Sequence, residues 1–334
     1  MGSSAGSTAI DADLIQRFKQ ALDRLNPQGQ RIGLAVSGGP DSMAMLLLAH
    51  EAIPGEFDVA SVDHGLRSEA REECALVEAA CAERGISCDV LRVEVGAGNV
   101  QSRARYARYN ALGRWATAQK LGAIATAHHA DDQAETVLMR LNRASGIDGL
   151  SGILEQIEMP YDGFGPGTAF QIVRPLLGFR RSELTDIVAT KSVRVAHDPS
   201  NDDVSYDRVR MRNALKNADW LDPAAIAASA QHLEEARMAL NHAFQDYYKA
   251  NVRRAEHDGE VDVWLKIPTE TSRYFVRKAV DSSVRSVGGD PRGGDVARLV
   301  DLLQNAKGGN VAGVLATVEG DEWYFRREPA RKTG

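Results

Sequence analysis

The sequence contains few cysteines, and their spacing excludes most of the chemistry that cysteine supports. Its 334 residues include three, Cys74, Cys81 and Cys88, at intervals of seven. No Cys-x-x-Cys pair and no histidine cluster accompanies them, so neither a metal site nor a redox centre is expected. We interpret all three as buried, unreactive thiols.

Long apolar runs are also missing. No stretch approaches the roughly 18 uncharged apolar residues of a membrane-spanning helix, and no basic segment followed by an apolar one is present at the amino terminus. We therefore expect a soluble, cytoplasmic, globular protein with no membrane partner. Apolar residues make up 43% of the chain, which is long enough for two domains.

Excess positive charge is the third absence. The formal net charge is −6, which disfavours a nucleic-acid partner because phosphate contacts need concentrated lysine and arginine. Residues 101–120 are nevertheless basic, with five Lys or Arg, no Asp or Glu, and interleaved Tyr106, Tyr109 and Trp115. A helix of this composition suits RNA phosphates. If it packs on a sheet, however, Tyr106 and Trp115 belong to the core.

Strand and helix patterns alternate along the first half of the chain. After an amphipathic helix capped by Asp11, strands are predicted at 31–36, 57–62, 87–95 and 123–127. Helices are predicted at 41–53, 70–84, 100–120 and 131–143. This alternation predicts an α/β fold with a doubly wound, mostly parallel sheet that carries helices on both faces.

The second half is less regular. A Gly-rich hairpin loop is expected at 159–168, then an extended return segment and a helix at 181–189. Asp222-Pro223 starts a later helix, and we expect two domains, 1–215 and 216–334. The second should be mainly helical α+β, with helices at 272–287 and 294–304 and short strands at 261–265 and on either side of Glu319-Gly320.

Polar residues follow three of the predicted strands. Residues 37–42 follow the first strand, Asp63 and His64 the second, and residues 128–132 the fourth. Ligands of such sheets bind at the carboxyl ends of the strands. These polar clusters should therefore meet in one crevice.

The first of these clusters, Ser-Gly-Gly-Pro-Asp-Ser at 37–42, has the composition of a phosphate-binding loop. Its glycines let the backbone approach an anion, its serines offer hydroxyl donors, and the following helix contributes free N–H groups. Neither G-x-x-x-x-G-K-[ST] nor G-x-G-x-x-G is present. A simple Gly-Pro turn is the structural alternative.

The loop resembles the pyrophosphate loop of the N-type ATP pyrophosphatases, the PP-loop family. Further motifs resemble the tRNA(Ile)-lysidine synthetase family within it, in order and at suitable spacing, over about residues 30–215. A weaker likeness covers 298–314. The motifs are VDHGLRSEA from Val62, TAHHADDQAETVLMRLNRASGIDGLSGI from Thr126, RPLLGFRRSEL from Arg174 and DPSNDDVSYDRVRMRN from Asp198.

This resemblance implies a Rossmann-like domain of the HUP type and a tRNA-binding second domain. It implies an ATP-dependent ligase that joins the ε-amine of L-lysine to the wobble cytidine of tRNA(Ile) with a CAU anticodon. ATP would be cleaved to AMP and pyrophosphate with Mg²⁺, through an adenylated tRNA. The product, lysidine, would switch codon reading from AUG to AUA.

The resemblance also implies roles for single residues. Asp132 and Glu135, three apart on one helix face, would bind the lysine ammonium and accept its proton. Arg208, with Arg212 as a second candidate, would contact the AMP phosphate or the base. ATP would be held by Ser37, Gly38, Gly39, Pro40, Asp41, Ser42, Asp63, His64 and Arg67. For His128 and His129, both a catalytic and a structural role are possible.

Structural interpretations compete with these roles. Acidic residues are favoured in the first turn of any helix, and we expect Asp131 to be the cap of this one. Arg208, Arg210 and Arg212 alternate, so an extended segment would place them on one face, whereas a helix would scatter them. A solvated charge run is the alternative for all three.

Other functions and partners also stay open. A tRNA thiolase would need a nucleophilic cysteine or a Cys-x-x-Cys pair, and a small-molecule amide synthetase would not need the basic helix. A non-catalytic nucleotide- or RNA-binding module would leave the two acidic residues unexplained. The sequence assigns no Mg²⁺ ligand, and the chain is compatible with a homodimer. Candidate tRNA contacts in the second domain are Arg277, Lys278, Arg298 and Lys307.

Overall fold

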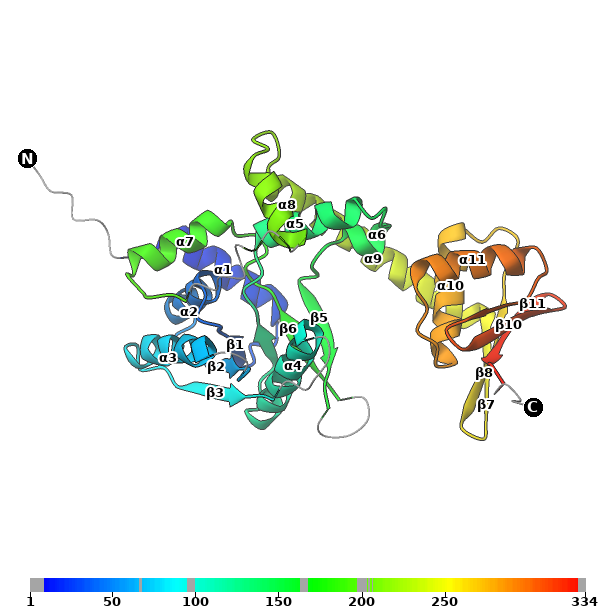
Figure 1. The fold of residues 1–334 in the computed structure, drawn as a ribbon, viewed down its shortest axis with the longest axis horizontal. Coiled ribbons are helices and arrows are strands. Elements are labelled where there is room, and N and C mark those ends of the chain that lie inside the picture. Colours follow the sequence, from blue (N-terminus) through cyan, green and yellow to red (C-terminus); the bar gives the residue numbers. More distant parts are fainter. Residues whose placement is uncertain are drawn as a thin grey trace, which may run out of the picture. The chain divides into compact units, whose positions relative to one another are not determined.

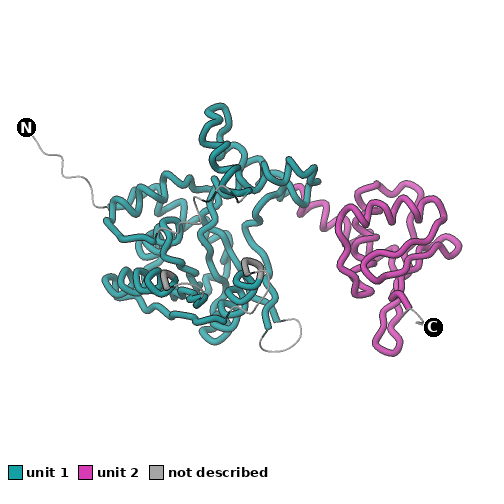
Figure 2. Tube along the Cα trace, viewed as in Figure 1, with its two compact units in different colours: residues 1–235 teal, residues 236–334 magenta. Residues whose placement is uncertain are grey.

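The chain forms two compact units, residues 1–235 and 236–334 (Figure 2). The computed structural model describes residues 9–65, 68–94, 100–162, 168–196, 203, 205 and 207–329. The units divide inside the long helix α9 (Pro223–Asn251), later than the domain boundary expected near residue 216. The boundary lies later than expected because α9 is continuous, and its first turns, up to residue 235, are grouped with the first unit.

A six-stranded sheet organises the first unit (Figure 1). Its order is β3-β2-β1-β4-β6-β5, and only the β5–β6 pair is antiparallel. The strands are β1 (Ile32–Ala35), β2 (Phe57–Asp63), β3 (Cys88–Arg92), β4 (Ala123–Ala125), β5 (Gln156–Pro160) and β6 (Ala169–Val173). The expected α/β fold with a mostly parallel sheet is therefore confirmed, as is the hairpin in its second half.

Eight helices are described in the first unit before α9. They are α1 (Ala12–Leu25), α2 (Pro40–Ala52), α3 (Ser68–Ala82), α4 (Val100–Ala118), α5 (Ala130–Leu141), α6 (Ile147–Leu150), α7 (Arg181–Thr190) and α8 (Asp207–Lys216). The sequence predicts all of these except α6 and α8. Both exceptions lie in polar or Gly-rich stretches that lack a long apolar stripe.

Helix α2 is apolar all round because it is enclosed on all sides. Every side chain from Ser42 to Ala49 is buried, and the helix packs against β1, α1 and α7. A helix without a polar face is stable only in such a position. Burial of α2 thereby anchors the loop of residues 37–39 that precedes it.

Helix α4 packs one face on the sheet. Tyr109, Leu112 and Trp115 are buried, so the expected core role of Trp115 is confirmed. Tyr106 is 59% exposed, and its expected core role is wrong. It lies one turn before the sheet contact, and its hydroxyl donates to Asp162 on the β5–β6 hairpin instead.

The second unit is a five-stranded antiparallel sheet packed against helices. Its order is β7-β8-β11-β10-β9, and α10 (Arg273–Ser286) and α11 (Gly293–Gln304) share its core with the end of α9. The strands are β7 (Val252–His257), β8 (Glu260–Lys266), β9 (Gly309–Val311), β10 (Val314–Glu319) and β11 (Glu322–Arg327). The edge strands β7 and β9 escape sequence prediction because β7 is mostly exposed and polar and β9 is very short.

Among the helices that the structure describes, none has the length and apolar character needed to span a membrane.

Close packing of β1 against α4 generates a stability prediction. A Cβ added to Gly33 would lie 2.4 Å from Trp115 Cζ3, so Gly33→Ala must displace the indole. We expect a loss of about 1–3 kcal/mol in unfolding free energy, measured by urea denaturation. Gly178→Ala is the control, because no atom lies within 4 Å of its added Cβ. Equal stability of the two variants would contradict this packing.

Candidate active site

The loop between β1 and α2 requires glycine at its centre. Gly38 has φ +84°, and a Cβ at this position would lie 3.0 Å from the Glu73 carbonyl oxygen. L side chains rarely adopt such a backbone conformation. Gly39, by contrast, meets only Ser37 Oγ at 3.8 Å, which leaves open space beside the start of α2.

The two serines hold this loop in shape. Ser42 Oγ accepts a hydrogen bond from Ser37 N at 3.1 Å and donates to the Gly39 carbonyl at 3.0 Å. No side chain caps the start of α2, and Pro40 at its first position has no N–H. The remaining N–H groups of the first turn and the positive end of the helix dipole suit an anion. The loop is thus shaped to bind phosphate.

The second polar cluster lies beside this loop. Strands β1 and β2 pair in parallel, so Asp63, the last residue of β2, and His64 after it lie at the same edge of the sheet as the loop. Asp63 Oδ1 accepts from Gly65 N at 2.9 Å and thereby shapes the turn. His64 is half-buried, and Arg67 lies outside the described residues.

The third cluster is an acidic pair on the first turns of α5. Glu135 is buried and Asp132 is half-buried, and both are bound by one arginine of α8. Arg208 Nη2 donates to Asp132 Oδ1 at 2.9 Å, and Arg208 Nε donates to Glu135 Oε2 at 2.9 Å. Arg212 Nε donates to Glu135 Oε1 at 2.8 Å. Arg181 Nη2 also lies 3.7 Å from Asp132 Oδ1 and 3.8 Å from Glu135 Oε1, so two carboxylates and three guanidinium groups form one network.

The helical state of α8 decides which arginines join this network. Arg208 and Arg212 lie one turn apart and face α5, whereas Arg210 is 64% exposed and pairs with Asp207. Because the segment is helical, Arg208, Arg210 and Arg212 do not share one face, as they would in an extended segment. A helix separates residues two apart and aligns residues four apart.

The predicted cap of α5 is wrong. Asp132 Oδ2, not Asp131, accepts a hydrogen bond from His129 N at 3.1 Å, where the helix begins. Asp131 Oδ2 instead accepts from Arg181 N at 2.8 Å, at the first position of α7, and Arg180 also contacts this carboxylate. The residue therefore caps a neighbouring helix, a contact that local spacing does not encode.

His129 connects the acidic pair with the phosphate loop. Its side chain is fully buried, and its Nε2 lies 3.5 Å from Asp41 Oδ2 and 3.4 Å from Asp132 Oδ2. Burial by itself would raise the pKa of Asp132. Electrostatic interactions with His129 and Arg208, together with the hydrogen bond from His129 N, outweigh burial and lower that pKa. Asp132 is therefore a carboxylate at neutral pH.

His128 has the opposite electrostatic environment. Burial lowers its pKa to about 4, and Arg174, Arg208 and Arg108 act in the same direction against the charge of Asp132. Its Nδ1 lies 3.2 Å from Thr126 Oγ1. His128 is consequently neutral at pH 7 and can serve as a hydrogen-bond partner without adding charge.

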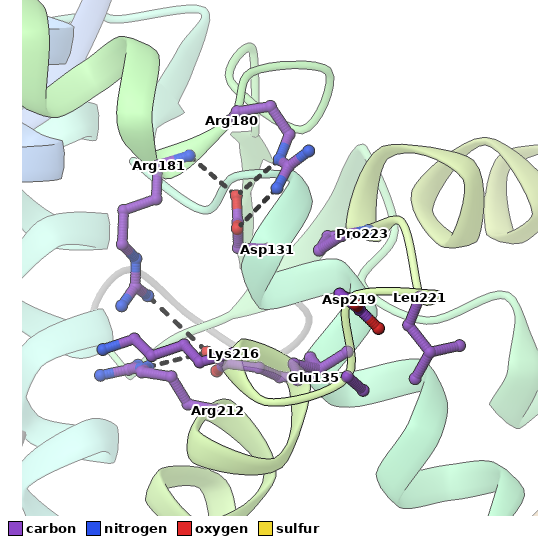
Figure 3. Close-up of a pocket in the computed structure, with 11 residues that line it drawn as sticks. Asp131, Glu135, Arg180, Arg181, Arg212, Lys216, Asp219, Leu221 and Pro223 are labelled. Carbon is purple, nitrogen blue, oxygen red and sulfur yellow. Dashed lines mark hydrogen bonds and ion pairs between the residues drawn. The ribbon is translucent and has the colours of Figure 1, made fainter.

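A pocket of about 210 Å³ opens on the α7–α8 side of the acidic pair (Figure 3). Figure 3 shows Arg212 and Arg181 directed at Glu135, and Arg180 directed at Asp131. The roles of Arg180, Arg181 and Lys216 in this pocket are not predicted from the sequence, although the first two belong to the RPLLGFRRSEL motif. The lining also includes Leu215, Ala218, Asp219, Leu221 and Pro223.

Metal binding is restricted by the available ligands. Among the described residues, no group of three or more His, Cys, Asp or Glu side chains could hold a metal ion. The Oδ1 atom of Asp41 is buried and has no hydrogen-bond partner among the described residues. Mg²⁺ commonly uses one or two carboxylates plus substrate phosphates, and Asp41 fits that limited role.

The lowered pKa of His128 predicts a pH dependence of stability. Above about pH 6.5 both folded and unfolded chains carry neutral His128. Below it the unfolded chain binds a proton that the folded chain takes up only near pH 4, so the stability contribution falls as pH falls. We expect urea denaturation to show a loss on the order of 2 kcal/mol from this group between pH 7 and 5.

The matched variant for this test is His128→Asn, which keeps a hydrogen-bonding group beside Thr126 but cannot titrate. Its stability should fall less than that of the wild type over the same interval. A parallel decline of both proteins would show that His128 does not contribute.

Comparison with known proteins identifies the family. A family model described as a PP-loop domain matches residues 10–219. A tRNA(Ile)-lysidine synthase of Novosphingobium aromaticivorans is 41% identical over 319 residues, covering 95% of this chain and 94% of that protein. Its counterpart in Zymomonas mobilis is 36% identical over 325 residues, covering 95% of both.

The fold is also similar to that of a solved U34-tRNA thiolase, NcsA from Methanococcus maripaludis with its [4Fe-4S] cluster. The TM-score is 0.52 at 16% identity, covering 67% of this chain and 80% of that one. At this identity the likeness concerns the fold alone. Together with the long matches above, the PP-loop domain shows that the chain belongs to the tRNA(Ile)-lysidine synthase family and is an ATP-dependent ligase.

Proposed function

We propose that this protein joins the ε-amine of L-lysine to the 2-position carbon of the wobble cytidine in tRNA(Ile) with a CAU anticodon. The names of its relatives support this reaction. The observation that carries it is that Asp132 and Asp41, which follows the phosphate loop, both lie within 3.5 Å of Nε2 of the same buried imidazole, that of His129. A nucleotide site and an amine site are thus brought into one crevice.

The first step forms an adenylated tRNA. The cytidine 2-oxygen attacks the α-phosphorus of ATP, an O–P bond forms, and pyrophosphate leaves. Ser37, Gly38, Gly39 and Ser42 bind the departing pyrophosphate through backbone and hydroxyl donors, which stabilises its charge. Asp41 would hold a Mg²⁺ ion, which would neutralise charge on the phosphates, and Asp63, His64 and Arg67 would contribute to nucleotide binding.

The second step replaces AMP by the amine. Lysine is almost entirely an ammonium ion at neutral pH because its free pKa is about 10.4. Asp132 and Glu135 attract this ammonium, and the proton moves to Asp132 as nitrogen bonds to the cytidine carbon and the C–O bond to AMP breaks. When Arg208 turns from the acidic pair to the AMP phosphate, Asp132 loses one of the interactions that lower its pKa and becomes a better base.

The pocket of Figure 3 is the proposed binding site for free lysine. Glu135 supplies negative charge at one side of it, and Arg180, Arg181 and Lys216 supply positive charge from α7 and α8. A free amino acid carries both an ammonium and a carboxylate group. This distribution of charge therefore complements the whole substrate rather than its side chain alone.

Basic surfaces of both units support an RNA substrate. Helix α4 supplies Arg105 and Arg108 near the crevice, where Arg108 acts on the pKa of His128. In the second unit Arg277, Arg298 and Lys307 are exposed. Lys278 is a weaker candidate because its Nζ donates to Asn241 and lies 5.4 Å from the Phe244 ring. We assign catalysis to residues 1–215 and tRNA binding to 216–334, and we expect a cytoplasmic enzyme, as a monomer or a homodimer.

Burial of the cysteines disfavours the thiolase alternative. Cys74 and Cys81 are buried as expected, whereas Cys88, also expected to be buried, is half-buried. Burial raises the pKa of the Cys74 thiol, which therefore remains protonated. A thiolate nucleophile needs the opposite environment. Lysine transfer is the function that the polar groups of this crevice support best.

Separate assays of the two steps test this proposal. For Asp132→Asn, which retains the hydrogen bond from His129 N, pyrophosphate release with tRNA and ATP should stay within about threefold of wild type. Incorporation of labelled lysine into RNA should fall by about 10²- to 10⁴-fold, the usual range for loss of acid–base catalysis. Both products are measured with purified CAU-anticodon tRNA.

Arg210→Ala is the control, because this arginine lies on α8 but is exposed and points away from the acidic pair. Both of its rates should match the wild type. Near-normal lysine incorporation by Asp132→Asn would remove Asp132 from the amine role. Release of pyrophosphate without any lysine in the RNA of the wild type would refute lysidine formation itself.

A further inference from the structure

Trp220 is the most exposed large hydrophobic side chain in the described part of the chain. It lies in the connection between α8 and α9 and is 79% exposed. Water contact around an indole ring is unfavourable, and tryptophan is found at sites where it contacts a partner. Its exposure therefore calls for an explanation other than packing.

The position of Trp220 relates it to the active site. Its chain neighbours Asp219 and Leu221 both line the pocket that contains Glu135. Trp220 itself is not part of that lining, so its ring stands outside the pocket at the rim. A partner that contacts the ring would also lie beside the opening.

The surroundings of Trp220 are charged rather than apolar. Helix α8, which ends four residues before it, carries Arg208, Arg210, Arg212 and Lys216 against one acidic residue, Asp207. The exposed residues next to Trp220 in the chain are Asn217, Asp219 and Asp222, and Asp222 pairs with Arg180 at 3.2 Å. An apolar protein surface or a membrane that contacted Trp220 would also contact the charged residues of α8 and of residues 219–222, which disfavours both partners.

An unpaired nucleobase fits a single exposed planar ring that follows a basic helix in the chain. Aromatic side chains stack on unpaired bases without reading their sequence, and neighbouring arginine and lysine residues bind the phosphates. A base that enters an active site must leave its stack. Its neighbours in the loop then lose one stacking surface, which an exposed tryptophan can replace.

We propose that Trp220 stacks on an unpaired base of the RNA substrate adjacent to the base that enters the crevice. This inference rests on the proposed function, since it takes RNA as the substrate. It identifies Trp220 as a substrate-positioning residue at the rim, which acts on RNA affinity and not on the bonds that form or break.

Binding of a CAU anticodon stem-loop RNA tests the proposal. The Kd of Trp220→Ala should rise about 5- to 100-fold, the range expected for loss of one base–aromatic stack, whereas Trp220→Phe should keep most of the affinity. A base-paired duplex of the same length should bind wild type and Trp220→Ala equally. Thermal unfolding should be unchanged in both variants because the ring is exposed.

Fluorescence supplies a readout specific to the ring. The wild type should lose tryptophan emission on adding the stem-loop, and Trp220→Phe should show much less quenching, while Trp264→Phe in the second unit should behave as the wild type. In turnover, Trp220→Ala should raise KM for tRNA and leave kcat unchanged.

Equal stem-loop affinity of wild type and Trp220→Ala would overturn the inference, as would an equal loss of affinity for the duplex. These outcomes are distinguishable from failure of the proposed function. Stem-loop binding that depends on Trp220 in a protein that makes no lysidine would refute the reaction and retain the stacking contact.

Discussion

The need to neutralise one buried carboxylate organises the polar centre of the first unit. Glu135 is almost inaccessible to water, and an unpaired carboxylate in such a place costs several kcal/mol. Arg208 and Arg212 meet this need from α8, and Arg208 reaches Asp132 at the same time. The docking of α8 on α5, and with it one wall of the pocket, depends on this charge balance.

The structural contacts of Asp132 and Glu135 compete with the chemical role proposed for them. Asp132 holds the start of α5, neighbours His129 and binds Arg208, so it is already satisfied. In the proposed reaction, the lysine ammonium must therefore replace a guanidinium contact rather than enter an uncompensated negative site. Such competition favours a cation whose other charged groups are also recognised, which fits the arginines around the pocket.

The fold and the phosphate loop were predictable because their signals are local. Because α2 is apolar on every face, its sequence predicts that it is buried. Glycine at position 38 permits the positive φ of the loop. The edge strand β7 was not predictable, since an exposed polar strand has no apolar alternation to detect. Asp131 shows the same limit at the site, because the helix that it caps is α7 and not its own.

Local order along the chain thus specifies which elements form, which loop can bind phosphate and which acidic residues share a helix face. Each of these properties depends on residues within a few positions of one another. The partners of the acidic pair lie 73 to 77 residues away, and their contacts exist only because α8 folds as a helix and packs on α5. Only the packing of distant elements determines that Arg208 and Arg212 bind the acidic pair and that Arg210 faces solvent. The same packing places His129 in contact with both Asp41 and Asp132.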